Sequence, residues 1–180
     1  MDISSKNEVE QIIQFTKGEK MFNNKPNRCF KDESGRIQWV SRSTAVVAVV
    51  KCADRFLVTK RGNKVSNTGK WCVPCGYIDW NESASDAVIR EVYEETGIYL
   101  KDYEISGVEK PYDLVTDPGV NWRQDIAIHF CVTIHSNRLP EVEFSKLDSN
   151  ETTDAKWISV DELSEYKFAF NHDKRILLCQ

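Results

Sequence analysis

GYIDWNESASDAVIREVYEETGI, the stretch from Gly76 to Ile98, decides how this chain is interpreted. Apolar residues recur at helical spacing in its second half. Gly97 stands where a helix commonly ends, because glycine adopts the left-handed backbone conformation without a side-chain clash. The pattern predicts a helix from about Ser83 to Thr96.

Three glutamates and one arginine lie close together on this predicted helix. At about 100° per residue, Glu91 and Glu95 fall within about 40° of each other, and Glu94 lies one row over. Half-buried like charges oppose each other's ionisation, and Arg90 alone cannot neutralise three carboxylates. Hard divalent cations such as Mg²⁺ or Mn²⁺ prefer oxygen ligands and also bind phosphate oxygens. The helix therefore predicts a site where a metal joins the protein to a phosphate.

A segment such as REVYEE would on its own usually be a solvated helix face, but the surrounding spacing argues against that interpretation. The whole stretch resembles the signature of the Nudix (MutT-like) hydrolases, without a gap. Its matching positions are Gly76, Glu82, Arg90, Glu91, Val92, Glu94, Glu95, Gly97 and Ile98. The similarity extends over roughly residues 41–163.

The resemblance implies an α/β (α+β) fold, a Nudix-type α/β/α sandwich around a mixed β-sheet. It also implies divalent-metal-dependent hydrolysis of the phosphoanhydride bond of a nucleoside diphosphate linked to another moiety. Glu91, Glu94 and Glu95 are then expected to bind Mg²⁺ or Mn²⁺, and Glu82 and Arg90 to support them. Such chemistry depends mainly on charge neutralisation and on holding a water in line with one phosphorus.

Two further positions are expected to join this site. Family members often use another glutamate from a loop before a strand that bears a tryptophan, and Glu151, six residues before Trp157, fits that position. Glu141 and Glu143 compete with it. The usual lead-in to the signature is Pro-Gly-Gly, whereas this chain has Cys75 before the signature glycine. The main-chain carbonyl of Cys75 is still expected to bind metal, although a glycine there could adopt angles that cysteine resists.

Candidate substrate contacts lie outside the signature, because loops select the substrate in such a fold. Arg61, at the end of a predicted strand, and Arg123, in a loop, are candidates for phosphate binding, with solvated surface charge as the equal alternative. Aromatic side chains are candidates for stacking on a base, although packing is their commoner use. These are Tyr77, Trp122, Tyr112 and Phe170.

The region after the signature bears on the substrate. Pro111 lies thirteen residues past Ile98, roughly where ADP-ribose hydrolases of the family have a proline, and the TDPGVNWRQ loop that follows is similar to theirs. This favours ADP-ribose or a nucleotide sugar as the small-molecule partner. A nucleoside triphosphate or a dinucleoside polyphosphate stays open as an alternative. A catalytically inactive nucleotide sensor is a further alternative, which the intact carboxylates disfavour.

The cysteines suggest two rival interpretations. WCVPC, residues 71–75, resembles the thioredoxin-type signature, so a thiol-disulfide redox module at Cys72 and Cys75 is an alternative. In such modules the first cysteine begins a helix, whereas here the predicted helix starts some eight residues after the pair. The pair could also supply half of a zinc site, but a structural site needs four ligands and no second closely spaced Cys or His pair follows. All six cysteines are expected to be reduced.

Composition limits the partners of the chain. Its 180 residues suffice for one domain with an extension. The 28 acidic and 24 basic residues give a formal net charge of −4, which provides no basic field for a nucleic-acid polymer. No apolar run approaches the ~20 residues needed to cross a bilayer, and the N-terminus lacks the apolar core of a signal peptide. We therefore expect a cytoplasmic protein with no membrane partner.

The chain is expected to divide after residue 40. Residues 1–40 are expected to form an extension, with a helix over residues 6–16 and a polar linker, that packs on the main domain or mediates a homodimer. Residues 41–180 are expected to form the hydrolase domain. Its predicted elements are a β-hairpin over 43–61, strands at 104–115, 125–134 and 155–159, and short helices at 161–166 and 171–180.

Overall fold

The computed structural model divides the chain into two compact units, Met1–Arg42 and Ser43–Gln180. The structure describes residues 12–14, 28–31, 33–35, 37–40, 43–79, 81–116, 124–146 and 150–180. Within these ranges no helix has the length and apolar character needed to cross a membrane.

The first unit contains a small antiparallel sheet in the order β1-β2-β3. Its strands are β1 (Ile12–Gln14), β2 (Arg28–Lys31) and β3 (Ile37–Val40). The helix expected over residues 6–16 is therefore wrong at Ile12–Gln14; the other residues of that range lie outside the described part of the chain. The β-branched Ile12 and Ile13 fit a pleated strand, and pairing with β2 overrides the helical spacing of the apolar residues.

The second unit is built on a seven-stranded mixed sheet whose main path runs β10-β5-β4-β9-β8. The expected hairpin is confirmed: β4 (Thr44–Cys52) and β5 (Arg55–Arg61) pair in antiparallel fashion, and Ala53 in the turn has a φ of 52°. β4 pairs with β9 in parallel, and the other neighbours are antiparallel. The remaining strands are β6 (Trp71–Cys72), β7 (Cys75–Tyr77), β8 (Glu104–Thr116), β9 (Gln124–His135) and β10 (Thr152–Ile158).

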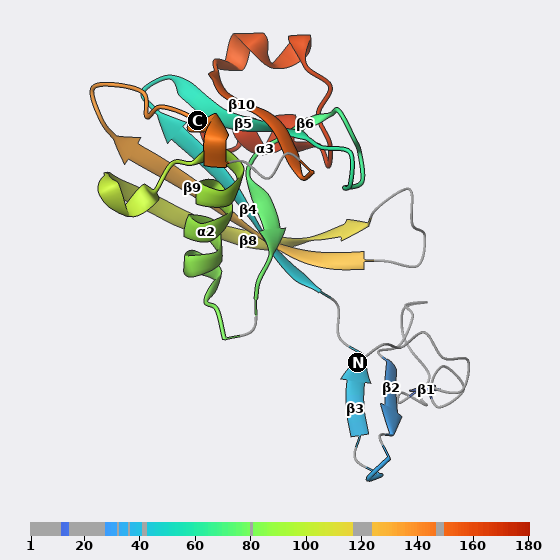
Figure 1. Ribbon diagram of the computed structural model, residues 1–180. Helices are drawn as coiled ribbons and strands as arrows, with labels where there is room; N and C mark the ends of the chain where they lie inside the picture. Colours follow the sequence, from blue (N-terminus) through green and yellow to red (C-terminus); the bar gives the residue numbers. More distant parts are fainter. Residues whose placement is uncertain are drawn as a thin grey trace. The chain divides into compact units, whose positions relative to one another are not determined.

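Both faces of this sheet are covered, because β4 is apolar on both sides. Val46, Ala48 and Val50 pack in one cluster with residues of helix α2 (Ala84–Thr96). Val47 and Val49 pack in a second cluster with residues of the 3-10 helix η3 (Val160–Glu165) and helix α3 (His172–Leu177). Figure 1 shows α2 beside β4, β8 and β9, with α3 near β5 and β6. The mixed α/β fold with a mixed sheet is as expected.

The predicted helix of the signature is confirmed as α2. Ser83 is its N-cap, and the Ser83 hydroxyl accepts a hydrogen bond from the backbone N–H of Asp86 at 3.1 Å. Gly97 ends the helix with a φ of 75°, a left-handed conformation that glycine adopts freely. A Cβ on Gly97 would also meet Glu143. Both ends of α2 are therefore determined by single residues.

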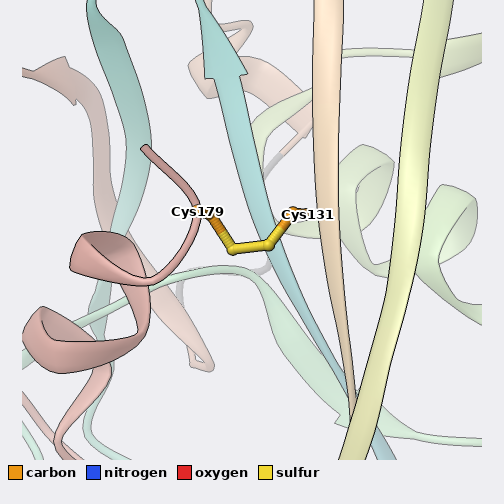
Figure 2. Close-up of a disulfide and its surroundings, with 2 residues drawn as sticks. All are labelled: Cys131 and Cys179. Atoms are coloured by element: carbon orange, nitrogen blue, oxygen red, sulfur yellow. A yellow bond between two sulfur atoms is a disulfide. The ribbon is translucent and has the colours of Figure 1, made fainter.

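The C-terminal segment crosses the sheet and is tied to it. The helix expected at residues 161–166 is a 3-10 helix, η3, and the one expected at 171–180 is the shorter α3. Two further 3-10 turns, η1 (Leu100–Asp102) and η2 (Phe144–Lys146), connect the other elements. Figure 2 shows a disulfide between Cys131 of β9 and Cys179 after α3.

This disulfide corrects the expectation that all cysteines are reduced. The two residues are 48 positions apart, and packing of the C-terminal segment over β9 brings them together. Sequence spacing could not show this proximity, because it depends on how α3 lies on the sheet. Cys52, Cys72 and Cys75 are free thiols in the described part of the chain.

Candidate active site

Glu91 lies against the backbone of the loop that leads into α2. Only 8% of the residue is exposed. A Cβ placed on Gly76 would collide with the Glu91 carboxylate, so only glycine admits this close approach. Gly76 is held in turn by β7, where it pairs with Val46 of β4. The glycine that opens the signature thus makes room for a carboxylate fifteen residues later.

Arg90 gathers the acidic side chains around this point. Its Nε and Nη2 donate to the two carboxylate oxygens of Glu82 at 2.8 and 2.9 Å, and its Nη1 donates to Glu91 at 2.7 Å and to Glu94 at 3.0 Å. Nη2 also donates to the main-chain carbonyl of Tyr77 at 2.8 Å. Hydrogen bonds from Arg90 lower the pKa of Glu82, and the same bonds raise that of Arg90. Arg90 therefore orients carboxylates and fixes the loop to the helix.

Glu95 lies one helical turn from Glu91 and is half-buried. The Thr59 hydroxyl donates to its Oε2 at 2.8 Å, and the backbone N–H of Cys75 makes a longer contact of 3.4 Å with Oε1. Burial raises the pKa of the Glu95 carboxyl well above its usual range, and the nearby sulfur of Cys72 raises it further. Without a cation, ionisation of Glu95 therefore lowers the free energy of unfolding.

The donor set fits a hard divalent cation. Burial also raises the pKa of Glu91, against the effect of Arg90. Glu94 is more open, with 55% of its side chain exposed. Arg90 provides a single positive charge against Glu82, Glu91, Glu94 and Glu95. Carboxylate oxygens in excess of local positive charge are the ligands that Mg²⁺ and Mn²⁺ prefer.

Glu151 lies in the loop before β10, which packs on the end of β5. The backbone N–H of Gly62 donates to the Glu151 carbonyl at 2.6 Å, and a Cβ on Gly62 would collide with the backbone of Asn150. The charge of Glu151 is the smallest of the contributions that affect the pKa of Glu91, which indicates that Glu151 lies near the carboxylates of α2. Its competitor Glu143 instead contacts Gly97 beyond the end of α2. Glu141, the other competitor, is exposed.

Cys75 lies in β7 with a φ outside the positive range, so cysteine adopts the backbone conformation of this site without strain. The structure thereby removes the difficulty that the sequence raised about this position. Cys75 borders both Glu95, through its N–H, and a neighbouring pocket.

That pocket has a volume of about 340 Å³. Its lining includes Cys75 and Gly76, which also border the carboxylate cluster of Glu91, Glu94 and Glu95. Three of the predicted substrate contacts line the pocket, and Arg61 and Tyr77 are two of them. Phe170 lines it as well, and the Arg61 guanidinium lies 5.0 Å from the centre of the Phe170 ring. Trp122 and Arg123 lie outside the described residues, and for Tyr112 only the backbone is described.

Sequence reasoning missed several residues that surround the site. Lys64 and Asp125 line the pocket, and the Tyr77 hydroxyl donates to the Asp125 carboxylate at 2.9 Å. The hydroxyl of Thr59 in β5 donates to the Glu95 carboxylate. The imidazole of His172 in α3 accepts a hydrogen bond from the N–H of Val73. A lone residue of each type carries no local signal, because its role arises only when distant strands and helices pack together.

His172 lies beside the two cysteines of the WCVPC stretch. The sulfur atoms of Cys72 and Cys75 and a ring nitrogen of His172 all lie within 4.8 Å of one another. Hydrogen bonding from Cys75 and from His172 lowers the pKa of Cys72 well below the usual thiol range. Cys72 is in strand β6, and the next helix begins only at Ala84, so the pair lacks the helix N-terminus of a thioredoxin-type centre.

A family model for the NUDIX domain matches residues 39–179, which include the carboxylate cluster, the pocket and α3. The chain belongs to the Nudix family. A MutT-like protein of Streptomyces ambofaciens is 32% identical over 124 residues, which cover 68% of each chain. An ADP-ribose pyrophosphatase of Methanocaldococcus jannaschii is 28% identical over 134 residues, or 74% of this chain and 70% of the relative.

A solved structure has the same fold as this Nudix hydrolase. It is the NUDIX domain of Shewanella oneidensis NrtR, crystallised in complex with ADP-ribose. The TM-score is 0.60 at 20% identity, and the match covers 76% of this chain and 85% of the other. At that identity the likeness establishes the fold alone.

Proposed function

We propose that this Nudix hydrolase uses Mg²⁺ or Mn²⁺ to cleave the phosphoanhydride bond of ADP-ribose or a related nucleoside diphosphate derivative. The observation that carries the proposal is the cluster of Glu91, Glu94 and Glu95, whose negative charge exceeds what Arg90 balances and which borders a pocket that contains cationic and aromatic side chains. A nucleoside diphosphate needs both features, positive charge at the diphosphate and a flat surface for the base.

Each side chain then has a definite task. Glu91, Glu94 and Glu95 would hold the metal, and Arg90 keeps their carboxylates oriented. When bound, the divalent cation supplies positive charge to the diphosphate and activates water for attack on phosphorus. Glu151 lies near enough to Glu91 to affect its pKa and is the candidate to accept the proton of that water.

The pocket supports a nucleotide as the substrate. Arg61 and Lys64 place two cations on its wall, suited to phosphate oxygens. Tyr77 and Phe170 offer aromatic surface for the base, and Asp125 offers an acceptor for a ribose hydroxyl or an amino group. The ADP-ribose pyrophosphatase among the relatives and the ADP-ribose complex of the Shewanella domain favour ADP-ribose within this class.

A substrate panel tests the proposal. Purified full-length protein is incubated with Mg²⁺ or Mn²⁺ and with ADP-ribose, nucleotide sugars, dinucleoside polyphosphates or nucleoside triphosphates, and the products are separated by chromatography. We expect AMP and ribose 5-phosphate from ADP-ribose, and no turnover with a chelator present. Hydrolysis in ¹⁸O-labelled water then identifies the attacked phosphorus.

Two variants make the assay specific. Glu91→Gln should abolish most turnover, because it removes a proposed metal ligand. Glu165→Gln is the matched control, since Glu165 is exposed in η3 on the opposite face of the sheet from α2. Preference for triphosphates would move the assignment to that alternative. No cleavage of any substrate with either metal would refute the proposed function and favour a sensor.

A further inference from the structure

A second metal-binding cluster lies beside the glutamates, and it has a different chemistry. The sulfur atoms of Cys72 and Cys75 and a ring nitrogen of His172 are mutually within 4.8 Å. Cys72 and His172 are almost fully buried, with 1% and 2% exposed, and Cys75 is half-buried. Two sulfurs and one imidazole are the ligands of a soft or borderline cation, whereas Mg²⁺ selects oxygen.

The protein builds this cluster from two segments that are joined by backbone contacts. Trp71, next to Cys72, forms a parallel bridge with Phe168. The N–H of Trp71 donates to the Lys167 carbonyl at 2.9 Å, and the N–H of Ala169 donates to the Trp71 carbonyl at 2.8 Å. The C-terminal segment is therefore held on β6 immediately before the histidine.

The chain then turns sharply to present the histidine. Phe170 and Asn171 both have a φ of 56°, which is uncommon for residues other than glycine, and for phenylalanine in particular. Strain of this kind is often found where a protein holds a side chain in a required position. Here the next residue is His172, whose Nδ1 accepts a 3.2 Å hydrogen bond from the backbone N–H of Val73.

We propose that Cys72, Cys75 and His172 bind one Zn²⁺ ion, separate from the proposed Mg²⁺ or Mn²⁺ site of the glutamates. Zn²⁺ replaces the two thiol protons, which pass to solvent, so no oxidant is required and no bond of the chain breaks. Two thiolates balance the charge of Zn²⁺, and the imidazole stays neutral. The 3.2 Å hydrogen bond from the N–H of Val73 to Nδ1 of His172 is lost if Zn²⁺ binds Nδ1.

The pocket would give access to such a site. Cys75 and His172 both line it, so a water molecule or a ligand group can complete the tetrahedron, as in zinc sites with three protein ligands. The ion would join β6 and β7 to α3. It would thereby fix the strand from which the N–H of Cys75 reaches Glu95. The zinc site is argued from its own ligands and does not depend on the proposed hydrolysis.

Cobalt titration of the full-length protein tests this site. Co²⁺ is added to the chain, reduced with a phosphine, in the presence of excess Mg²⁺, and the absorption spectrum is recorded. We expect a thiolate-to-cobalt charge-transfer band and the visible bands of tetrahedral Co²⁺, both removed by Zn²⁺. Elemental analysis after dialysis should find about one Zn²⁺ per chain.

Variants assign the signal to these ligands. Cys72→Ser and His172→Gln should weaken binding at least about tenfold, and the same Zn²⁺ concentration should raise the Tm of the wild type by more than it raises the Tm of these variants. Cys52→Ser removes a buried thiol outside the cluster, and Cys179→Ser removes one partner of the disulfide with Cys131; both variants should leave the spectrum unchanged. If Cys72→Ser does not fold, Cys75→Ser at the half-buried position replaces it.

The proposal is overturned if Mg²⁺ displaces the bound Co²⁺, if the charge-transfer band is absent, or if the band survives in all three ligand variants. It is also overturned if the reduced protein forms a Cys72–Cys75 disulfide in air at the same rate with and without Zn²⁺, because bound zinc protects its thiolates. Each readout is metal binding, so its failure leaves the hydrolase assignment intact, and an inactive hydrolase would leave the zinc site intact.

Discussion

Replacing Glu95 by glutamine separates the charge of this residue from its shape. Glutamine has the same length, and its carbonyl oxygen can still accept the hydrogen bond that Thr59 donates at 2.8 Å. Only the longer contact from the Cys75 N–H depends on the second carboxylate oxygen. The substitution therefore removes one negative charge from the proposed metal site and leaves the surrounding packing in place.

We expect turnover to fall by at least about 10²-fold, the usual size of the loss when one electrostatic group of an active site is removed. Stability should change in the opposite direction. Burial raises the pKa of the Glu95 carboxyl well above its ordinary value of 4.5, so the folded protein keeps the proton longer than the unfolded chain does. The resulting stabilisation is complete below pH about 4.5 and is lost as the pH rises through the folded-state pKa.

Chemical denaturation of metal-free protein measures this effect. The wild type should lose unfolding free energy as the pH rises from 4.5 towards neutrality, and Glu95→Gln should lack this part of the dependence. At neutral pH without metal the variant should be the more stable protein, and Mg²⁺ should stabilise the wild type selectively. Glu165→Gln should match the wild type in both activity and stability. Full activity of Glu95→Gln, or identical pH profiles of both proteins, would refute the role assigned to this carboxylate.

Three other changes have definite expected outcomes. Arg90→Lys should cut kcat at least about tenfold in steady-state assays, because lysine cannot hold both oxygens of Glu82 and reach Glu91 at once; unchanged kcat would contradict this. Gly76→Ala should weaken Mn²⁺ binding, measured by calorimetry, because the new methyl group displaces the Glu91 carboxylate. Cys179→Ser should lower the unfolding free energy under oxidising conditions by about 2–4 kcal/mol without changing turnover, since the disulfide closes a long loop. Peptide mapping of the unreduced protein should find that disulfide, and its absence would remove the basis for the stability difference.

The carboxylates of the signature could be found from sequence because they lie on one helix. Spacing within a helix converts directly into position, so Glu91 and Glu95 fall on one side whatever the rest of the chain does. Gly97 likewise acts within a few residues of itself, and the structure ends the helix there. Structure that depends on neighbouring residues can therefore be predicted from the sequence.

Contacts between segments far apart in the chain could not be predicted from the sequence in this way. Thr59 belongs to β5, and β5 pairs with β6, which precedes β7 and the loop into α2. Thr59 contacts Glu95 only because of this pairing in the folded sheet. The sequence argues against a zinc site, because no second pair of ligands lies near Cys72 and Cys75. The fold places His172 of α3 beside these two cysteines. Apolar spacing predicts a helix at Ile12–Gln14, where the structure has a strand, because the spacing does not reveal a pairing partner in β2.

The amino-acid sequence alone determined the family resemblance, because that resemblance is a match of residue types and spacing from Gly76 to Ile98. It also determined the carboxylate helix and its end at Gly97, because these depend on interactions within about four residues. Tertiary structure alone decided which residues surround the site: the pocket that joins Arg61 to Phe170, and the disulfide between Cys131 and Cys179. It also brought a histidine to two cysteines. These features depend on how strands and helices pack across the sheet, and packing depends on the whole chain at once.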